Sequence, residues 1–162
     1  MAAKCLTKIM YLARFARFDL LRAVSSLSQF ITKWSKLQDK KLYRIIRYLV
    51  YSREHRQIGF VGDNWEDIGL CLFTDSDFAG DQDSKRSCSG VFLGLYGPNI
   101  YFPLAGLSRK QTVTSHSSVE AEIVAMNCGL RVEGLPALTL WEIILGHKTV
   151  TKRNINEMWK DK

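Results

Sequence analysis

The sequence predicts an α/β domain in which three strands precede helices, with a basic pair of helices ahead of it. Three observations support this fold class. Short apolar runs bounded by turn residues begin at Gly69, apolar residues recur at helical spacing before and after them, and Ser117 with Glu120 marks a helix start. With 162 residues, 46% of them hydrophobic, the chain has material for one core of ordinary size.

Residues 1–56 are expected to form a basic helical segment. An apolar and basic stretch over residues 1–18 is expected to form a helix or to lead into one. The clearer helix follows it, with Asp19 as its cap and its end near Thr32 to Ser35. A second helix is expected from about Asp39 to Ser52. Its inward face consists of Leu42, Ile45, Ile46 and Leu49, and its opposite face carries Lys40, Arg44 and Arg47.

The formal net charge of +7 is concentrated in this segment. Residues 1–56 contain 13 Lys and Arg against 3 Asp and Glu, whereas residues 57–162 contain 10 against 13. This asymmetry is expected when one part of a protein contacts a phosphate backbone and another holds metal-binding carboxylates. We therefore predict that Lys40, Arg44 and Arg47 contact nucleic acid. The alternative is that they form a solvated helix face.

Residues 54–68 contain two glycines and fit neither the helical nor the strand periodicity, so we expect a domain boundary there. The second domain then covers residues 57–146. Residues 147–162 are polar and weakly patterned, and we expect them to form a tail.

Three meandering strands are expected in the second domain. The first follows Gly69 and ends at Asp75, because its apolar run is too short for an ordinary helix. The second covers about residues 91–96. The third covers about residues 100–104, where Pro103 indicates a frayed or edge position.

Two helices are expected after the strands. Ser117 opens the first of them, since Glu120 three residues later completes a capping box. Its apolar residues at helical spacing, expected to face the core, are Val119, Ile123, Met126 and Leu130. The other helix is expected to begin near Pro136 and to stop at Gly146.

Asp75 and Glu122 are the candidate catalytic and metal-binding residues. Asp75 ends a strand, and Glu122 lies in the first turns of the helix that follows the strands. Carboxylates in these positions can converge on one divalent cation, because hard ions such as magnesium prefer oxygen ligands. The alternative is that both are solvated charges. The nearby Asp77, Asp81 and Asp83 are better explained by a polar loop.

Further candidate nucleic-acid ligands are expected in loops beside these acids. Arg109 and Lys110 are the main ones, accompanied by Ser87, Ser89 and Gln111. Such side chains can contact phosphate, although solvated loop residues are the alternative.

No apolar stretch reaches the roughly 18 residues that a membrane span requires, so no membrane partner is expected. The four cysteines include no CxxC pair, which favours reduced thiols. We expect an intracellular protein of a reducing compartment, either the cytoplasm or the nucleus.

The order of a strand ending in Asp, a hairpin and a helix carrying Glu resembles the ribonuclease H fold. Three strings are similar to the ribonuclease H region of copia-type retrotransposon polyproteins: FTDSDFAGDQDSKRSCSG, SRKQTVTSHSSVEAEIVAM and LWEIILG. Two upstream strings resemble the helical segment that follows reverse transcriptase in those polyproteins: YLARFARFDLLRAVSSLSQF and LYRIIRYLVY. The resemblance covers about residues 10–146 and is specific, because separated strings agree in order and spacing.

The resemblance implies a nuclease that cuts the RNA strand of an RNA–DNA hybrid with two magnesium or manganese ions held by four acids. In such a site one ion helps to form the attacking hydroxide and the other stabilises the leaving oxygen. Asp75 matches the first acid of the family, and Glu122 matches its helix acid. The other two are expected downstream, the first in an Asp-Asn string, and no such string follows Gly146.

The resemblance therefore leads us to expect a fragment or a degenerate copy, with a mixed ribonuclease-H-like sheet whose C-terminal part is missing. Two carboxylates do not offset the repulsion between two close cations, so we expect this chain to be inactive alone. Two alternatives stay open. In the first, the chain is a non-catalytic nucleic-acid-binding module. In the second, it is a domesticated structural subunit that docks or self-associates through an open sheet edge.

Overall fold

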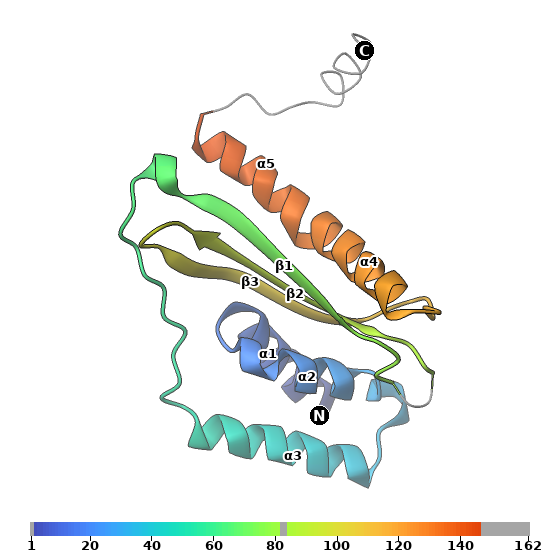
Figure 1. Cartoon of the computed structure of the whole chain (residues 1–162). Helices are drawn as coiled ribbons and strands as arrows, with labels where there is room; N and C mark the ends of the chain where they lie inside the picture. The colour runs from blue at the N-terminus through green and yellow to red at the C-terminus, as the bar shows by residue number, and fades with distance from the viewer. Residues whose placement is uncertain (1, 82–83, 147–162) are drawn as a thin grey trace.

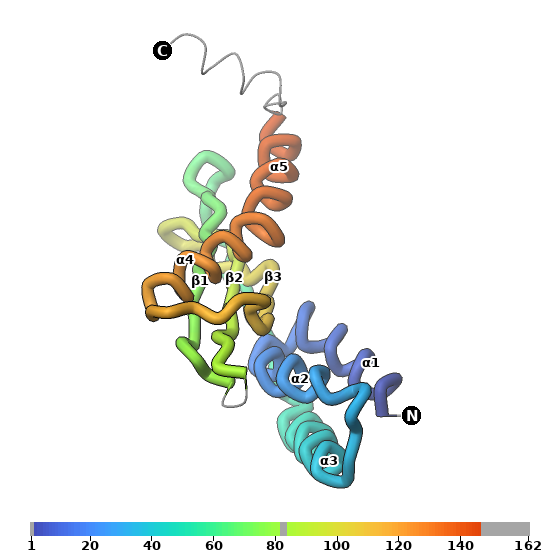
Figure 2. The backbone as a smooth tube through the Cα atoms, turned by 90° about the vertical axis from the view of Figure 1, so that its right-hand side faces the viewer, coloured from blue at the N-terminus to red at the C-terminus, as the bar shows by residue number. Residues whose placement is uncertain are grey.

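The computed structural model describes residues 2–81 and 84–146. Its helices and strands, in chain order, are α1 (Ala2–Phe15), α2 (Leu21–Ser28), α3 (Lys36–Tyr51), β1 (Gly69–Asp77), β2 (Cys88–Tyr96), β3 (Tyr101–Lys110), α4 (Ser118–Gly129) and α5 (Leu135–Ile144). Helices α4 and α5 run along one side of the sheet, α1 and α2 lie on its other side, and α3 lies beyond them (Figures 1 and 2). The predicted α/β class is confirmed.

The sheet has the order β1-β2-β3, and both pairings are antiparallel. The described strands thus include no parallel pair of the kind that a mixed sheet requires. Strand β3 is an edge strand, as Pro103 predicted, and Leu104 bulges out of register because Leu93 pairs with Ala105 and Gly94 with Pro103. Strand β1 is the other edge, and among the described strands it pairs only with β2.

One hydrophobic core holds the helical segment together. Its buried residues are Leu6, Ile9, Ala13, Leu20, Leu21, Val24, Leu27, Leu42 and Ile45. The predicted inward positions Leu42 and Ile45 are confirmed, whereas Ile46 is exposed. Helix α3 begins at Lys36, earlier than predicted, because Ser35 and Gln38 form a capping box with the backbone amides at its start.

A buried arginine fixes the end of α3 against the segment before α2. Arg17 donates to the carbonyl oxygen of Ser52 at 3.0 Å and to Oδ2 of Asp19 at 2.8 Å. The Tyr48 hydroxyl donates to the same Asp19 oxygen at 2.8 Å. The hydrogen bond from Arg17 holds the pKa of Asp19 below its ordinary value, and the same bond raises the pKa of Arg17. Asp19, predicted as a helix cap, pairs with Arg17 instead.

Helix α4 packs on β1 and β2 through its smallest residues, which are Ala121, Ala125 and Gly129. A Cβ atom on Gly129 would lie 2.6 Å from Cγ2 of Thr74, so only glycine permits this close approach. The prediction that large apolar residues of α4 face the core is wrong. They are exposed: Val119 by 66%, Ile123 by 55%, Met126 by 49% and Leu130 by 44%.

A π-helical segment, Leu130–Gly134, joins α4 directly to α5. The two helices therefore continue one another along the sheet, where a separate helix was predicted to begin near Pro136 (Figure 1). Pro136 occupies the first turn of α5, as predicted, but the helical backbone at Gly134 continues from the π-helical segment, so α5 has no separate start.

Within residues 2–81 and 84–146, no helix is both long and apolar enough to cross a membrane. All four cysteines are free thiols. The predicted tail, residues 147–162, lies outside the described residues.

Candidate functional site

Asp75 and Asp77 belong to the face of β1 that is turned toward the helical segment. Side chains alternate along a strand, and Thr74 lies against Gly129 of α4. Phe73, one residue before Thr74, pairs in register with Phe92, whose ring contacts Phe18 of the helical segment. By this alternation Asp75 points away from α4.

A cavity of about 430 Å³ lies between this face and the helical segment. The helical segment contributes Phe18, Leu21 and Arg22 to its walls, and β1 contributes Asp75 and Asp77. Asp75 is exposed and forms no ion pair with any described residue. It is therefore the acid at this strand end that is free to meet a ligand.

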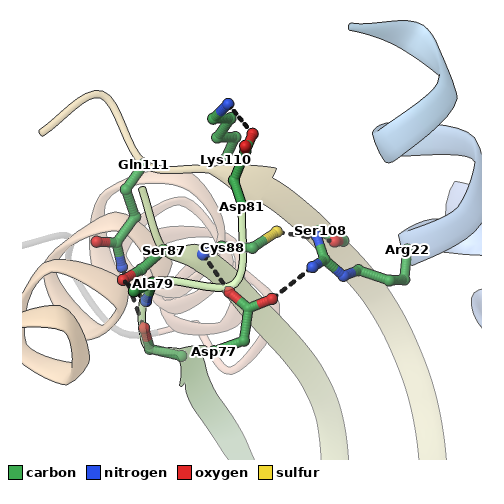
Figure 3. Close-up of polar contacts among 10 residues, drawn as sticks. Arg22, Asp77, Ala79, Asp81, Ser87, Cys88, Ser108, Lys110 and Gln111 are labelled. Atoms are coloured by element: carbon green, nitrogen blue, oxygen red, sulfur yellow. Dashed lines mark hydrogen bonds and ion pairs between the residues drawn. The ribbon is translucent and has the colours of Figure 1, made fainter. Parts of the chain in front are cut away.

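Asp77 is held on both of its carboxylate oxygens (Figure 3). Oδ2 accepts a hydrogen bond from Nη2 of Arg22 at 2.5 Å, and Oδ1 accepts one from the backbone amide of Cys88. Asp77 was predicted to lie in a polar loop, but it is the last residue of β1. Its contacts connect β1, β2 and α2, so its role is structural.

Asp81 is also engaged. Its carboxylate pairs with the Lys110 ammonium (Figure 3). It also accepts a hydrogen bond from the backbone amide of Ser84 at 3.1 Å. Arg109 and Lys110 were predicted to lie in a loop, and both belong to the end of β3. Arg109 is exposed there, whereas Lys110 is partly buried. Asp83 lies outside the described residues.

Ser87 and Gln111 lie in loops as predicted, whereas Ser89 belongs to β2, and all three side chains are buried rather than placed to contact phosphate. Only 1% of Ser87, 1% of Ser89 and 5% of Gln111 is exposed. The Gln111 amide nitrogen donates to Oγ of Ser89 at 3.1 Å and to the carbonyl oxygen of Ala121 at 2.9 Å. These residues fasten the strands to the start of α4, because buried polar groups require such partners.

Glu122 stands on the exposed surface of α4. Ser117 caps this helix as predicted, since its hydroxyl accepts a hydrogen bond from the Glu120 amide at 3.1 Å. The Glu120 carboxylate accepts from the backbone amide of His116 at 2.7 Å. Glu120 is therefore a capping residue, and Glu122 is the acid of this helix that remains free.

Asp75 and Glu122 are not accompanied by a third metal-binding side chain in the described part of the chain. Helix α4 covers the face of β1 opposite to the one that carries Asp75. No group of three or more His, Cys, Asp or Glu residues that could hold a metal ion occurs in the described part of the chain. The described acids do not fit the predicted two-ion centre, so the assignment of magnesium or manganese to Asp75 and Glu122 stays a prediction.

The outer face of α3 combines cations with aromatic rings. Lys40, Arg44 and Arg47 are all exposed on it, as predicted, and none of them forms an ion pair with a described residue. The Arg47 guanidinium lies 6.0 Å from the ring centroid of Tyr43 and 5.6 Å from that of Tyr51. Our reading of the sequence missed these tyrosines, although their four-residue spacing around Arg47 is visible in it.

No family model and no solved structure matches this chain. The secreted RxLR effector protein 161 of Plasmopara viticola is 34% identical over 123 residues, which are 74% of this chain and 79% of that protein. An uncharacterized mitochondrial protein of Arabidopsis thaliana, AtMg00240, is 32% identical over 116 residues, which are 64% of this chain and 95% of that protein.

The retrovirus-related Pol polyprotein from transposon RE1 of Arabidopsis thaliana is 35% identical over 116 residues. That alignment covers 70% of this chain and 7% of the polyprotein, so the chain corresponds to a short part of it. The Pol polyprotein from transposon RE2 is 34% identical over the same shares of both chains. The chain therefore belongs to a family of proteins related to a short segment of the retrovirus-related Pol polyproteins of transposons.

Proposed function

We propose that this chain combines the helical connection segment of a copia-type polyprotein with part of its ribonuclease H region, and that it binds RNA–DNA hybrid without cutting it. The observation that carries the proposal is the row of Lys40, Arg44 and Arg47 on α3, whose charges no described carboxylate neutralises. Unpaired cations on one face attract a phosphate backbone and release its counterions on binding. The similarity to Pol polyproteins supports a nucleic-acid partner.

Asp75 and Glu122 are proposed as two of the acids that bind magnesium or manganese when a complete nuclease site is present. Neither carboxylate forms an ion pair with a described residue, which supports this role. The neighbouring acids are already engaged: Asp77 pairs with Arg22, Asp81 pairs with Lys110, and Glu120 caps α4. Further acids must complete the site, since two carboxylates leave most of the repulsion between two close cations uncompensated. We therefore expect no hydrolysis by the 162-residue chain.

Arg109 is proposed as a second phosphate contact, at the end of the sheet that also carries Asp77. It is exposed at the end of β3 and forms no ion pair with a described residue. Lys110 beside it is partly neutralised by Asp81, so its contribution to phosphate binding is smaller than the sequence predicts.

A second candidate function, that of a domesticated structural subunit, is favoured by the apolar surface of α4 and α5. Ile123, Leu138 and Ile143 are each about half exposed there. This surface borders β1, the unpaired edge of the described sheet. An apolar face beside an open strand edge is suited to another copy of the chain. Such a subunit would act in the cytoplasm or the nucleus.

Incubation of the purified chain with a labelled RNA–DNA hybrid and magnesium or manganese tests the proposed function. We expect binding in a mobility-shift assay and no cleavage products, with Asp75→Asn leaving both results unchanged. Cleavage that disappears in Asp75→Asn would show that the chain is a complete nuclease. Absence of any binding would remove the proposed role of α3.

A further inference from the structure

We propose that the outer face of α3 binds single-stranded nucleic acid by stacking unpaired bases on Tyr43 and Tyr51. This inference rests on the proposed function, which assigns phosphate contacts to the same face, and it specifies the class of nucleic acid bound. The occupant is RNA or DNA whose bases are free of a partner strand.

Residues four positions apart share one face of a helix, so Tyr43, Arg47 and Tyr51 form a row of planar groups along about two turns, or roughly 12 Å. The Arg47 guanidinium contacts both rings, at 6.0 Å and 5.6 Å from their centroids. This arrangement holds the two rings in one continuous row without covering them, since both remain largely exposed.

Tyr43 is 63% exposed and Tyr51 is 78% exposed, so neither ring contributes to the core. Tyr48 differs from them, because its hydroxyl donates to Asp19 and its ring lies 5.5 Å from the Arg17 guanidinium. Tyr48 therefore belongs to the contact that anchors α3. Tyr43 and Tyr51 have no such contact and are free to stack on a ligand.

A shallow depression of about 420 Å³ on this face is lined by Lys40, Tyr43, Arg44, Arg47, Tyr48 and Tyr51. The lining contains three cations and no carboxylate. Lys40 lies about one turn before Tyr43, and Arg44 lies about one turn before Arg47. From these positions they can contact the phosphates of a strand whose bases lie on the rings.

A single strand fits this combination better than a duplex does. In a duplex the bases are already stacked on one another, so their faces are closed to Tyr43 and Tyr51, and only phosphates can be used. An unpaired strand presents both phosphates and base faces, and aromatic stacking is the usual source of its affinity for proteins.

Fluorescence anisotropy of the full chain with labelled single-stranded RNA, single-stranded DNA and RNA–DNA hybrid tests the inference. We expect the double variant Tyr43→Leu, Tyr51→Leu to bind single strands about a hundredfold more weakly, at about tenfold per ring, with little change for the hybrid. The double variant Tyr43→Phe, Tyr51→Phe should keep wild-type affinity, because it retains both rings. The control double variant Tyr11→Leu, Phe15→Leu removes a stacked pair on α1 that is equally exposed, and should leave binding unchanged.

Wild-type affinity of the Tyr43→Leu, Tyr51→Leu variant for single strands would overturn the inference, as would an equal loss for single strands and hybrid. If Lys40→Gln and Arg44→Gln weaken the binding of all three probes in that case, the proposed function is kept and only the stacking role is rejected. If the wild-type chain binds none of the three probes, both fall. Circular dichroism of each variant establishes that α3 is intact.

Discussion

Arg22 of α2 donates a hydrogen bond to the Asp77 carboxylate at the end of β1, across 55 positions of sequence. The bond ties the helical segment to the strand that carries Asp75. The other oxygen of Asp77 accepts a hydrogen bond from the Cys88 amide, so Asp77 is fixed in place. Asp75, by contrast, forms no ion pair with a described residue. A structural acid thus lies two residues from a candidate functional one.

Replacing Asp77 should lower the free energy of unfolding more than replacing its partner Arg22 does. Asp77→Ala removes the acceptor of the buried Cys88 amide, and we expect the free energy of unfolding to fall by about 1–3 kcal/mol. Arg22→Gln should cost less than about 1 kcal/mol, because its side chain is 55% exposed and the pair is screened by solvent. Urea denaturation measures both. Equal losses would mean that the bond to Cys88 contributes nothing.

Acid should weaken the anchor of α3. The pKa of Asp19 is lower in the folded chain than in the unfolded chain, so the unfolded state binds the proton first as the pH falls. The stabilisation is complete above the unfolded pKa of about 4 and is lost as the pH falls through the folded pKa. Thermal melts from pH 6 downward should show this loss, and Asp19→Asn should show a smaller decline. Parallel declines would contradict the assignment.

Gly129 should resist substitution. In Gly129→Ala the new Cβ would lie 2.6 Å from Cγ2 of Thr74, and relieving this clash requires α4 to move off the sheet. We expect a loss of about 1–3 kcal/mol, larger than the gain in helix propensity. Gly69→Ala is the matched control, because no atom lies within 4 Å of its Cβ, and it should change stability by about 0.5 kcal/mol or less. Similar effects in both variants would contradict the close approach of α4.

The exposed apolar face of α4 and α5 should cause self-association. Light scattering after size exclusion should give a mass that rises with protein concentration, because a contiguous apolar surface is removed from water when two copies meet. The double variant Ile123→Gln, Leu138→Gln should shift the chain toward the monomer. Val61→Gln, at an exposed residue outside this face, should not. A wild-type monomer at every concentration would exclude the proposed subunit role.

Local features of the fold could be predicted from the sequence. Ser117 caps α4 because its hydroxyl bonds the backbone within one turn, and Leu42 and Ile45 are buried because they lie on one face of a single helix. Asp19 could not be predicted in the same way. Its partner Arg17 is oriented by Ser52, which is 35 positions farther along the chain.

The face of α4 was mispredicted for a physical reason. Apolar residues occur on several sides of this helix, among them the buried Ala125 and the exposed Ile123, so the spacing of the large residues did not mark the buried side. The close contact at Thr74 favours small residues instead, and Gly129 alone satisfies it. Gln111 was likewise misplaced, because its burial depends on Ser89 and Ala121, which come from a different strand and a helix.

The salt dependence of binding shows whether α3 holds nucleic acid through its cations. Affinity for an RNA–DNA hybrid is measured over a range of salt concentrations for the wild type and for the triple variant Lys40→Gln, Arg44→Gln, Arg47→Gln. Lys4→Gln, Lys8→Gln, Lys33→Gln is the control with the same loss of charge at exposed positions elsewhere. We predict weaker binding and a logarithmic slope that is lower by about 0.9 for each lost phosphate contact in the α3 variant alone. An unchanged slope and affinity in that variant would contradict the claim, because this face would then be merely solvated.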